Sequence, residues 1–484
     1  LAVGSKPNAA TLPLFLMLYE WLFIPKSESI FKKIHWIWIA GGLGLFLVLA
    51  LVFLGFDPLD RIMAAYNRRE FSLPERLMTQ LRVVVFYVSL LFYPLSARLN
   101  LDHDYPVSQA ILEPSLTVFS GAAVLALAVL GAYTVRRHKM TAFAVFWFLG
   151  NLLIESSFIG LEMIFEHRTY LPSMLLLSIA AIWVFRKIQP KWVAICLLLG
   201  IIILESFWTY HRNEIWRSRT AFWTDCVAKS PDKTRPRYNL GCALIKKQLF
   251  EESASQFQSA VRLSPRFSGA HYNLGLALSE KQRFKQAIHH FKTAVQMDPA
   301  HADAHNNLAN TYAVLGKSEK ALFHYQEAVR LSANNIDYLL NLAMELESQG
   351  EKSKAVDVYQ QALDQAPKQV RIINRLAYAL FRAEKYEDAQ RLLQRAILLD
   401  PHNAEGLGKL GDVLLKTGQV ESAIAYFRRA LKINSKDAQT HYNLGIALYQ
   451  QGEHEAARNH FIAASRLSPD LSFPAHLFED AAGQ

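Results

Sequence analysis

The sequence predicts an all-α protein, in which a multi-spanning helical membrane domain is followed by an α-solenoid of seven helical repeats. Two observations carry this prediction. Up to about Tyr210 the chain is dominated by apolar runs such as WIWIAGGLGLFLVLALVFLGF, and beyond that point it is polar and helical in pattern. The second half also repeats itself with a fixed period. We therefore expect one region in a membrane and one region in water.

The apolar runs predict the membrane domain, because a spanning helix needs about 20 mostly apolar residues. Six segments come close to this requirement, at roughly residues 8–24, 34–56, 116–135, 141–160, 171–187 and 192–209. A seventh stretch, residues 83–95, is shorter and contains Pro94, which fits a re-entrant or interfacial segment better than a span. We assign residues 1–210 to the membrane domain.

Basic residues between the predicted spans indicate which side of the membrane each loop faces. Three loops are basic: Lys26, Lys32 and Lys33; Arg136, Arg137 and Lys139; and Arg186, Lys187 and Lys191. All three lie in the cytoplasm if residues 83–95 do not cross, and residues 57–115, 165–173 and everything after Tyr210 then face outward. If residues 83–95 do cross, one basic loop must lie outside. The net charge of +10 therefore does not require a nucleic acid partner.

Three smaller features bear on the compartment and the extent of the chain. The sequence has no Asn-x-Ser/Thr sequon, which for an outward-facing domain favours a bacterial inner membrane, with the repeats in the periplasm. The cysteines Cys226 and Cys242 fit buried thiols, or alternatively a disulfide. Leu1 begins almost inside a span, so we expect this chain to be a fragment of a longer protein.

The repeats have a period of 34 residues, with units starting at 234, 268, 302, 336, 370, 404 and 438 and ending at 471. The seventh position is always Leu: Leu240, Leu274, Leu308, Leu342, Leu376, Leu410 and Leu444. The eighth is Gly or Ala, which lets the two helices of a unit approach closely. This period is the signature of tetratricopeptide repeats, and the array resembles that family. Residues 211–233 then form a linker with a half-repeat, and residues 472–484 a C-terminal cap.

The sixth position of the repeats is the candidate peptide-binding site. It carries Asn239, Asn273, Asn307, Asn341 and Asn443, and changes to Arg375 and Lys409 in the fifth and sixth units. An asparagine recurring along the inner helices can hydrogen-bond the backbone of an extended peptide, since one side chain holds both donor and acceptor. Such a ladder resembles that of sugar transferases with tetratricopeptide repeats. The alternative is that these asparagines are common in the repeat and simply solvated.

Polar clusters on the predicted outer face are the second candidate site. They are LNLDHDYPVS at residues 99–108 and FEHRTYLPS at residues 165–173, with Arg68, Arg69, Arg76 and Arg82 nearby. Arginine suits phosphate, and a carboxylate beside a histidine offers a general base or a metal site. The alternatives are a loop ion pair with interfacial anchors for residues 166–170, and an ordinary solvated turn for residues 102–104.

The order of these motifs resembles the transmembrane and tetratricopeptide repeat family, whose members look like C-type membrane glycosyltransferases. The resemblance implies transfer of a sugar from a polyprenyl-phosphate donor to an acceptor, often Ser or Thr of a protein. It also implies a donor side lined by Arg76, His103, Asp104, Glu166, His167, Arg168 and Tyr170. Arg76 or Arg168 would hold the lipid phosphate. The family's catalytic carboxylate would lie upstream of Leu1, so we assign no catalytic residue.

We therefore predict a membrane protein O-glycosyltransferase-like chain whose outward array binds protein partners or acceptors. A different class is a non-enzymatic scaffold for envelope, secretion or pilus assembly. A third is a polymerase or ligase of lipid-linked glycans. The expected partners are membrane lipid and a protein or peptide in the repeat groove. The expected donor substrate is a polyprenyl-phosphate sugar, a divalent metal is optional, and no other cofactor is implied.

Overall fold

The computed structural model describes residues 12–25, 66, 71–92, 98–100, 103, 105–153 and 170–468. Within them the regular structure is helical, apart from an isolated β-bridge between Ala110 and Glu113, which confirms the all-α prediction. The chain divides into two compact units, Leu1–Ser264 and Pro265–Gln484.

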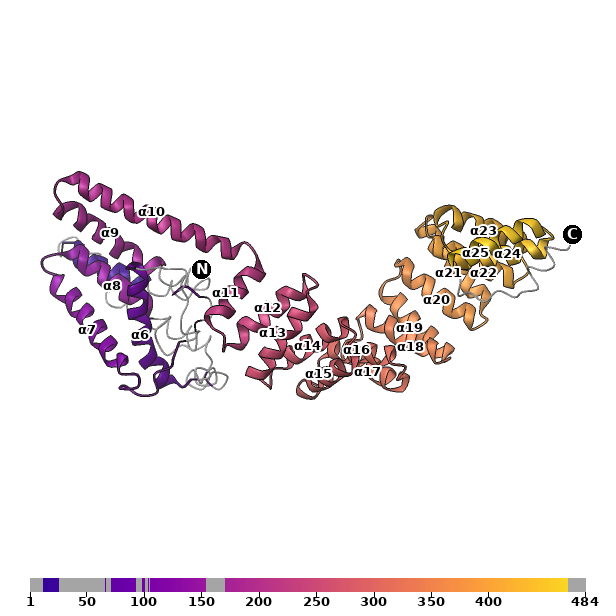
Figure 1. The fold of residues 1–484 in the computed structure, drawn as a ribbon, viewed down its shortest axis with the longest axis horizontal. Helices are drawn as coiled ribbons and strands as arrows, with labels where there is room; N and C mark the ends of the chain where they lie inside the picture. The colour runs from indigo at the N-terminus through magenta and orange to yellow at the C-terminus, as the bar shows by residue number, and fades with distance from the viewer. Residues whose placement is uncertain are drawn as a thin grey trace, which may run out of the picture. The chain divides into compact units, whose positions relative to one another are not determined.

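The first unit begins with six described helices (Figure 1). They are α2 (Leu12–Phe23), α6 (Leu73–Phe92), α7 (Leu116–Thr134), α8 (Lys139–Leu153), α9 (Tyr170–Lys187) and α10 (Lys191–Trp216). Helix α7 packs on α6 and α8, and α9 packs on α8 and α10. The short α7–α8 and α9–α10 turns both lie at the left end of these helices in Figure 1.

Two of the described helices are long and apolar enough to cross a bilayer, by length and composition alone. They are Leu116–Thr134 and Lys191–Trp216, with hydropathies of 2.0 and 2.1, at the predicted spans 116–135 and 192–209. Helices α2, α8 and α9 lie within the predicted spans 8–24, 141–160 and 171–187 or start close to them. The predicted span 34–56 lies outside the described residues. The multi-spanning membrane domain therefore stays a prediction.

Residues 83–92 form the second half of α6, which is one continuous helix of 20 residues. Their apolar side chains, including Val83 and Tyr87, pack against Phe148 and Leu152 of α8 in a buried cluster. This stretch therefore lies inside the helical assembly as part of a longer element. Whether it crosses a bilayer stays a prediction.

The first unit ends with α11 (Arg219–Lys229), α12 (Thr234–Ile245) and α13 (Phe250–Leu263). Cys226 on α11 is fully buried, and no disulfide joins it to Cys242, which favours the buried-thiol interpretation for these described residues. The chain passes from α10 to α11 through two residues, so the apolar helices run almost directly into the repeats.

The second unit contains six helix pairs. They are α14 (Ser268–Glu280) with α15 (Phe284–Met297), α16 (Ala302–Val314) with α17 (Ser318–Leu331), α18 (Ile336–Ser348) with α19 (Lys352–Gln365), α20 (Val370–Arg382) with α21 (Tyr386–Leu399), α22 (Ala404–Lys416) with α23 (Val420–Ile433), and α24 (Ala438–Gln451) with α25 (His454–Leu467). Each second helix also packs on the first helix of the next pair. No pair covers its apolar face alone, so the stack forms a solenoid.

Close approach within a pair explains the small eighth position. A Cβ added to Gly275 would lie 2.7 Å from the Phe291 ring, and one added to Gly411 would lie 2.5 Å from the Phe427 ring. All four glycine repeats pair Gly with Phe in this way. Where Ala309, Ala343 and Ala377 replace glycine, the residues at the place of Phe291 are Tyr325, Tyr359 and Leu393, and all of them are buried. The small eighth residue therefore leaves room for the large side chain that the second helix places against it.

Second helices end in the same register with or without proline. Helix α15 ends at Met297, two residues before Pro299, as expected of a residue that cannot continue a helix. Helix α17 ends at the equivalent Leu331 and α23 at Ile433, although Ala333 and Ser435 stand where other repeats have proline. Packing on the next repeat therefore sets these ends as firmly as proline does.

Candidate functional site

The first helices of consecutive repeats in the second unit contact one another: α14 with α16, α16 with α18, α20 with α22, and α22 with α24. We call the surface that they share the inner face. Side chains at the second, sixth, ninth and thirteenth positions of each repeat fall on one stripe of these helices, because their spacing follows the helical turn. All of them are half-buried or exposed. The array thus presents one polar stripe that runs from repeat to repeat.

The predicted asparagines lie in this stripe, and three of them join neighbouring repeats. Asn307 donates from Nδ2 to Tyr272 Oη at 2.9 Å, and Asn341 donates to Asn306 Oδ1 at 2.9 Å. Asn443 donates to Asp412 Oδ1 at 2.5 Å. Asn239 and Asn273 occupy the same register and are half-buried.

Each of these three amides therefore uses one N–H to hold adjacent repeats together, and the side chain stays partly open to solvent. The sequence alone did not predict that these asparagines join neighbouring repeats. The feature of the sequence that could have indicated it is the polar residue at the fifth or ninth position of the preceding repeat. Binding of a peptide by the asparagines stays a prediction.

Further inter-repeat contacts order the same face. Tyr338 Oη donates to Asp303 at 2.5 Å, and Arg371 pairs with Asp337 at 3.1 Å. Burial raises the pKa of Asp412 to about 6, which the hydrogen bond from Asn443 partly opposes. An ordinary Asp titrates near 3.9, so this carboxylate is destabilised at neutral pH.

Histidine pairs recur between the two helices of three repeats. The Nδ1 atoms lie 3.1 Å apart in His271–His290, 3.1 Å in His305–His324 and 2.9 Å in His441–His460. Burial, with the charge of the partner histidine, lowers the pKa of His290 and of His324 to about 4. Among the described residues no group of three or more His, Cys, Asp or Glu is arranged to hold a metal.

The predicted donor residues fall on several parts of the first unit. Arg76 is fully buried in α6, and His103 lies edge-on to Phe86, with ring centroids 5.5 Å apart. Phe86 stands ten residues beyond Arg76, about 15 Å along the helix axis, so α6 holds these two sites roughly three turns apart. Asp104, Glu166, His167 and Arg168 lie outside the described residues, as does the Tyr170 side chain.

Arg82, one of the arginines near the predicted outer clusters, is buried in α6. Its Nη1 donates to Pro106 O at 3.0 Å and to Ser108 Oγ at 3.1 Å, and its guanidinium lies 4.8 Å from the centre of the Tyr105 ring. Ser108 also donates from its backbone N to Thr79 Oγ1 at 2.8 Å. Burial raises the pKa of Tyr105, and Arg82 opposes that shift. Together these contacts fix the loop onto α6.

The same loop is fastened to the half-repeat helix. Asn100 Nδ2 donates to Ser230 Oγ at 2.7 Å, and Lys229 Nζ donates to Leu99 O at 2.9 Å. Lys229 also pairs with Asp225 at 2.6 Å, and Arg212 of α10 pairs with Asp225 at 3.1 Å. The polar loop predicted to face outward is thus joined to the start of the array within the first unit.

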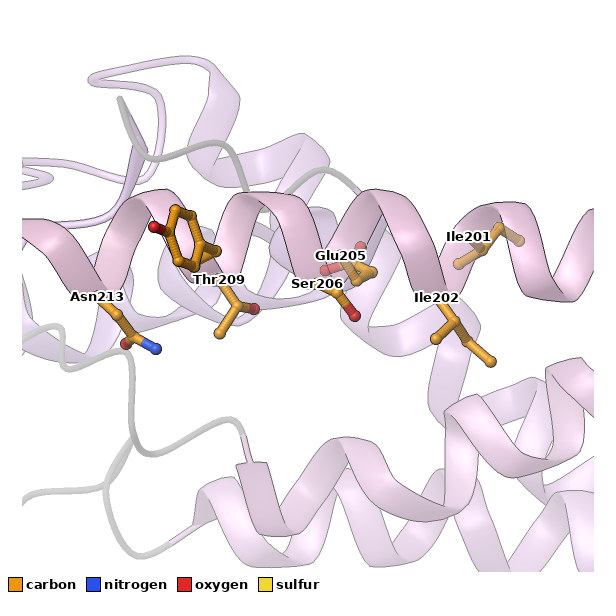
Figure 2. A pocket seen from close by; sticks show the side chains of 7 residues that line it. Ile201, Ile202, Glu205, Ser206, Thr209 and Asn213 are labelled. Carbon is orange, nitrogen blue, oxygen red and sulfur yellow. The ribbon is translucent and has the colours of Figure 1, made fainter.

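An open hollow runs along α10 in Figure 2. Its lining side chains are Ile201, Ile202, Glu205, Ser206, Thr209, Tyr210 and Asn213, all from this one helix. A single helix face does not enclose a ligand, so we assign no substrate to this hollow.

Comparison with known proteins bears on the repeats. Family models described as tetratricopeptide repeat match residues 234–267 and 336–369, 268–301 and 302–335, and 374–438 and 410–472. These segments are tetratricopeptide repeats. No curated protein matches the chain.

Several solved structures are similar in fold to parts of this chain. YrrB, a TPR protein with an unusual peptide-binding site, is 21% identical over 38% of this chain and 95% of its own, with a TM-score of 0.35. A tetratricopeptide repeat protein from Parabacteroides merdae is 17% identical over 52% and 99%, with a TM-score of 0.43. PilF from Pseudomonas aeruginosa is 20% identical over 45% and 97%, with a TM-score of 0.38.

Proposed function

We propose that this protein is a membrane-held scaffold whose tetratricopeptide array binds a protein partner as an extended segment along the inner face. Tetratricopeptide repeats bind protein or peptide partners, and the polar stripe supplies the matching surface. The observation that carries this proposal is the recurrence of asparagines at the same position of the repeats along the stripe. Half-buried asparagines recur at the sixth position of the first four repeats, and the first helices α14, α16 and α18 touch in turn, so a chain lying across them meets an amide in each of these repeats.

The exposed apolar surface of α7 and α10 supports attachment to a membrane. Phe119 and Leu125 on α7 are 69% and 65% exposed, and Ile203 on α10 is 68% exposed. A core helix of a soluble domain would bury such side chains, and a large apolar surface marks contact with lipid or with another protein. Lipid is the surrounding that an all-round apolar helix of this length fits.

Basic turns support an outward array. Arg136 and Arg137 follow α7, Arg186 and Lys187 end α9, and both turns lie at the same end in Figure 1. Helix α10 starts at that end and finishes at the junction with α11. Basic loops stay in the cytoplasm, so the array emerges on the other side, which in a bacterial inner membrane is the periplasm.

Site-specific photo-cross-linking in cells tests the scaffold. A photoreactive residue at Asn341, on the inner face, is expected to give a discrete adduct with a protein partner. The same residue at Gln360, exposed on the second helix α19, is the matched control and gives none. Equal adducts at both positions, or adducts at Gln360 alone, would contradict binding along the inner face.

A second candidate function is transfer of a sugar from a polyprenyl-phosphate donor. The observation that favours it is the pair of buried arginines, Arg76 and Arg82, on a helix packed among apolar ones, since ionisable groups buried among apolar helices often mark functional sites. The loop that Arg82 fixes is also joined to the array through Asn100 and Ser230, which would bring an acceptor held by the repeats towards the donor side.

In this second proposal Arg76 or Arg168 holds the phosphate, and His103, Asp104, Glu166, His167 and Tyr170 line the rest of the donor side. Arg168→Ala is expected to abolish binding of a polyprenyl-phosphate sugar, and Arg137→Ala, in a basic turn, is the control. Unchanged donor affinity in Arg168→Ala would rule out that assignment. In a transfer assay, a protein acceptor supports this candidate, and a glycan acceptor indicates a polymerase or ligase instead.

A further inference from the structure

The inner face changes character in the fifth repeat. Helix α20 carries Arg371, Arg375, Tyr378 and Arg382 at spacings of four, three and four residues, which places them on one stripe. The helix contains no acidic residue. Its three arginines are exposed and Tyr378 is half-buried. We call these four residues, together with Lys409 of α22, the cationic stripe.

One member of the cationic stripe lies over its aromatic ring. Lys409 Nζ lies 4.0 Å from the centre of the Tyr378 ring. Phe381 stacks beside Tyr378, with ring centroids 6.4 Å apart. A cation–π contact of this kind holds the long lysine side chain in place, which lowers the conformational entropy that binding must overcome.

The preceding repeats lack this charge. The same four positions hold Asp303, Asn307, Asn310 and Val314 in α16, and Asp337, Asn341, Met344 and Ser348 in α18. In the following helix α22 they hold Glu405, Lys409, Asp412 and Lys416, so acidic and basic residues balance there. Nearby carboxylates use only part of the positive charge: Asp337 pairs with Arg371 at 3.1 Å, Glu405 pairs with Lys409 at 3.5 Å, and the charge of Glu347 acts on Arg382. Arg375 and Arg382 remain exposed on the stripe.

We propose that the cationic stripe docks an acidic segment of the polypeptide that the array binds. Guanidinium groups pair with carboxylates through two parallel hydrogen bonds. Exposed arginines at one-turn intervals therefore match Glu or Asp side chains spaced along an extended chain. This inference rests on the proposed scaffold function, because it names the chemistry of the partner at one section of the same face.

Calorimetry on the full chain in detergent tests the docking with a defined probe. The probe is a peptide of about twelve residues in which Glu alternates with Gly and Ser, and the matched peptide has Gln in place of Glu. The Glu peptide is expected to bind at least tenfold more tightly than the Gln peptide. Its affinity should fall as salt rises from about 0.05 to 0.5 M, because exposed charges are screened. Equal affinity for the two peptides would overturn the proposal.

Paired variants locate the binding. Replacing both Arg375 and Arg382 by Gln is expected to weaken the Glu peptide about tenfold. Arg429→Gln is the matched control, because Arg429 is also exposed and lies over a tyrosine, Tyr426, but on the second helix α23. Loss in the control as large as in the double variant would overturn the assignment to the stripe.

Two further outcomes separate this inference from its alternatives. Anionic phosphatidylglycerol vesicles that bind through Arg375 and Arg382, while the Glu peptide does not, would make a membrane surface the ligand and overturn the inference. If cross-linking at Asn341 persists while the Glu peptide fails to bind, the acidic docking is wrong and the scaffold stands. If cross-linking also fails, the scaffold function itself is wrong.

Discussion

The apolar helices of the first unit and the repeats of the second unit distribute polarity in opposite ways. In α6 the side chains of Arg76 and Arg82 are buried, and on α7 Phe119 is 69% exposed. In the repeats, Leu274 and Phe291 are buried, and charged side chains such as Arg371 face solvent. Both regions are all-helical, so helix formation does not distinguish them. The difference is the one expected if, as we propose, lipid surrounds the first region and water the second.

The two regions also differ in how far along the chain their contacts reach. Each described repeat helix packs mainly on its neighbours in sequence. The loop before α7 is instead held by contacts such as Asn100 with Ser230, which are 130 residues apart. A solenoid of local contacts tolerates change in one repeat better than a loop that depends on a few distant partners.

The largest expected effect comes from introducing a charged side chain into each of the two regions. Leu199→Lys places an ammonium near the middle of α10, which is expected to destabilise the chain in lipid by about 3 kcal/mol. Leu398→Lys, at an array leucine that is 84% exposed, is expected to change stability by less than about 0.5 kcal/mol. Thermal unfolding in lipid nanodiscs measures both. Equal tolerance at the two sites would show that α10 does not face lipid.

Glycines test the packing of the two regions. Gly275→Ala places a Cβ 2.7 Å from the Phe291 ring and is expected to cost about 2 kcal/mol, because a well-packed core does not accept an added methyl. Adding Phe291→Leu should restore most of the loss, as in the Ala377–Leu393 pair. Gly200→Ala on α10 meets nothing within 4 Å and is the neutral control. Urea unfolding measures these effects, and a harmless Gly275→Ala would contradict the close approach.

The raised pKa of Asp412 makes the stability of the array depend on pH. Because burial raises its pKa to about 6, the protonated carboxyl is favoured in the folded state, and stability is lost as pH rises from about 4 through 6. Asp412→Asn should therefore stabilise the protein above pH 6 by about 1–2 kcal/mol and give no gain below pH 4. Asp364→Asn, on an exposed site, is the control. A gain that does not depend on pH would refute this role for the charge.

The smallest expected effect comes from the histidine pairs. The pKa of His290 is lowered to about 4 in the folded chain, so the unfolded chain binds a proton at a higher pH than the folded chain does. The free energy of unfolding is therefore highest above about pH 6.5 and decreases as pH falls through 4. His290→Asn, facing His271 and His289, should reduce the loss between pH 7 and pH 4 by about 1 kcal/mol. His402→Asn, at an exposed histidine of another repeat, is the control. Unfolding midpoints of the wild-type and variant proteins, measured between pH 4 and pH 7, test this prediction.

Much of the repeat architecture could be predicted from local pattern. The leucine at the seventh position and the small residue at the eighth recur with the helical period, and Leu308 and Ala309 are fully buried as that pattern requires. The donor site was less predictable, because its residues come from separate segments. The structure places Arg76 in α6 and His103 against Phe86, ten residues further along that helix, and it shows that Arg82 is buried, which no local spacing indicated.

By itself, the sequence determined the all-helical class, the tetratricopeptide repeats and the contrast between apolar and polar halves, because periodicity and composition act over a few helical turns. Only the tertiary structure decided how side chains from different repeats and loops meet. It assigned Asn307 and Asn341 to inter-repeat hydrogen bonds, placed Lys409 of α22 over the Tyr378 ring of α20, and joined the loop at Asn100 to Ser230. Such contacts depend on how helices distant in the chain pack in space, and no short stretch of sequence encodes that packing.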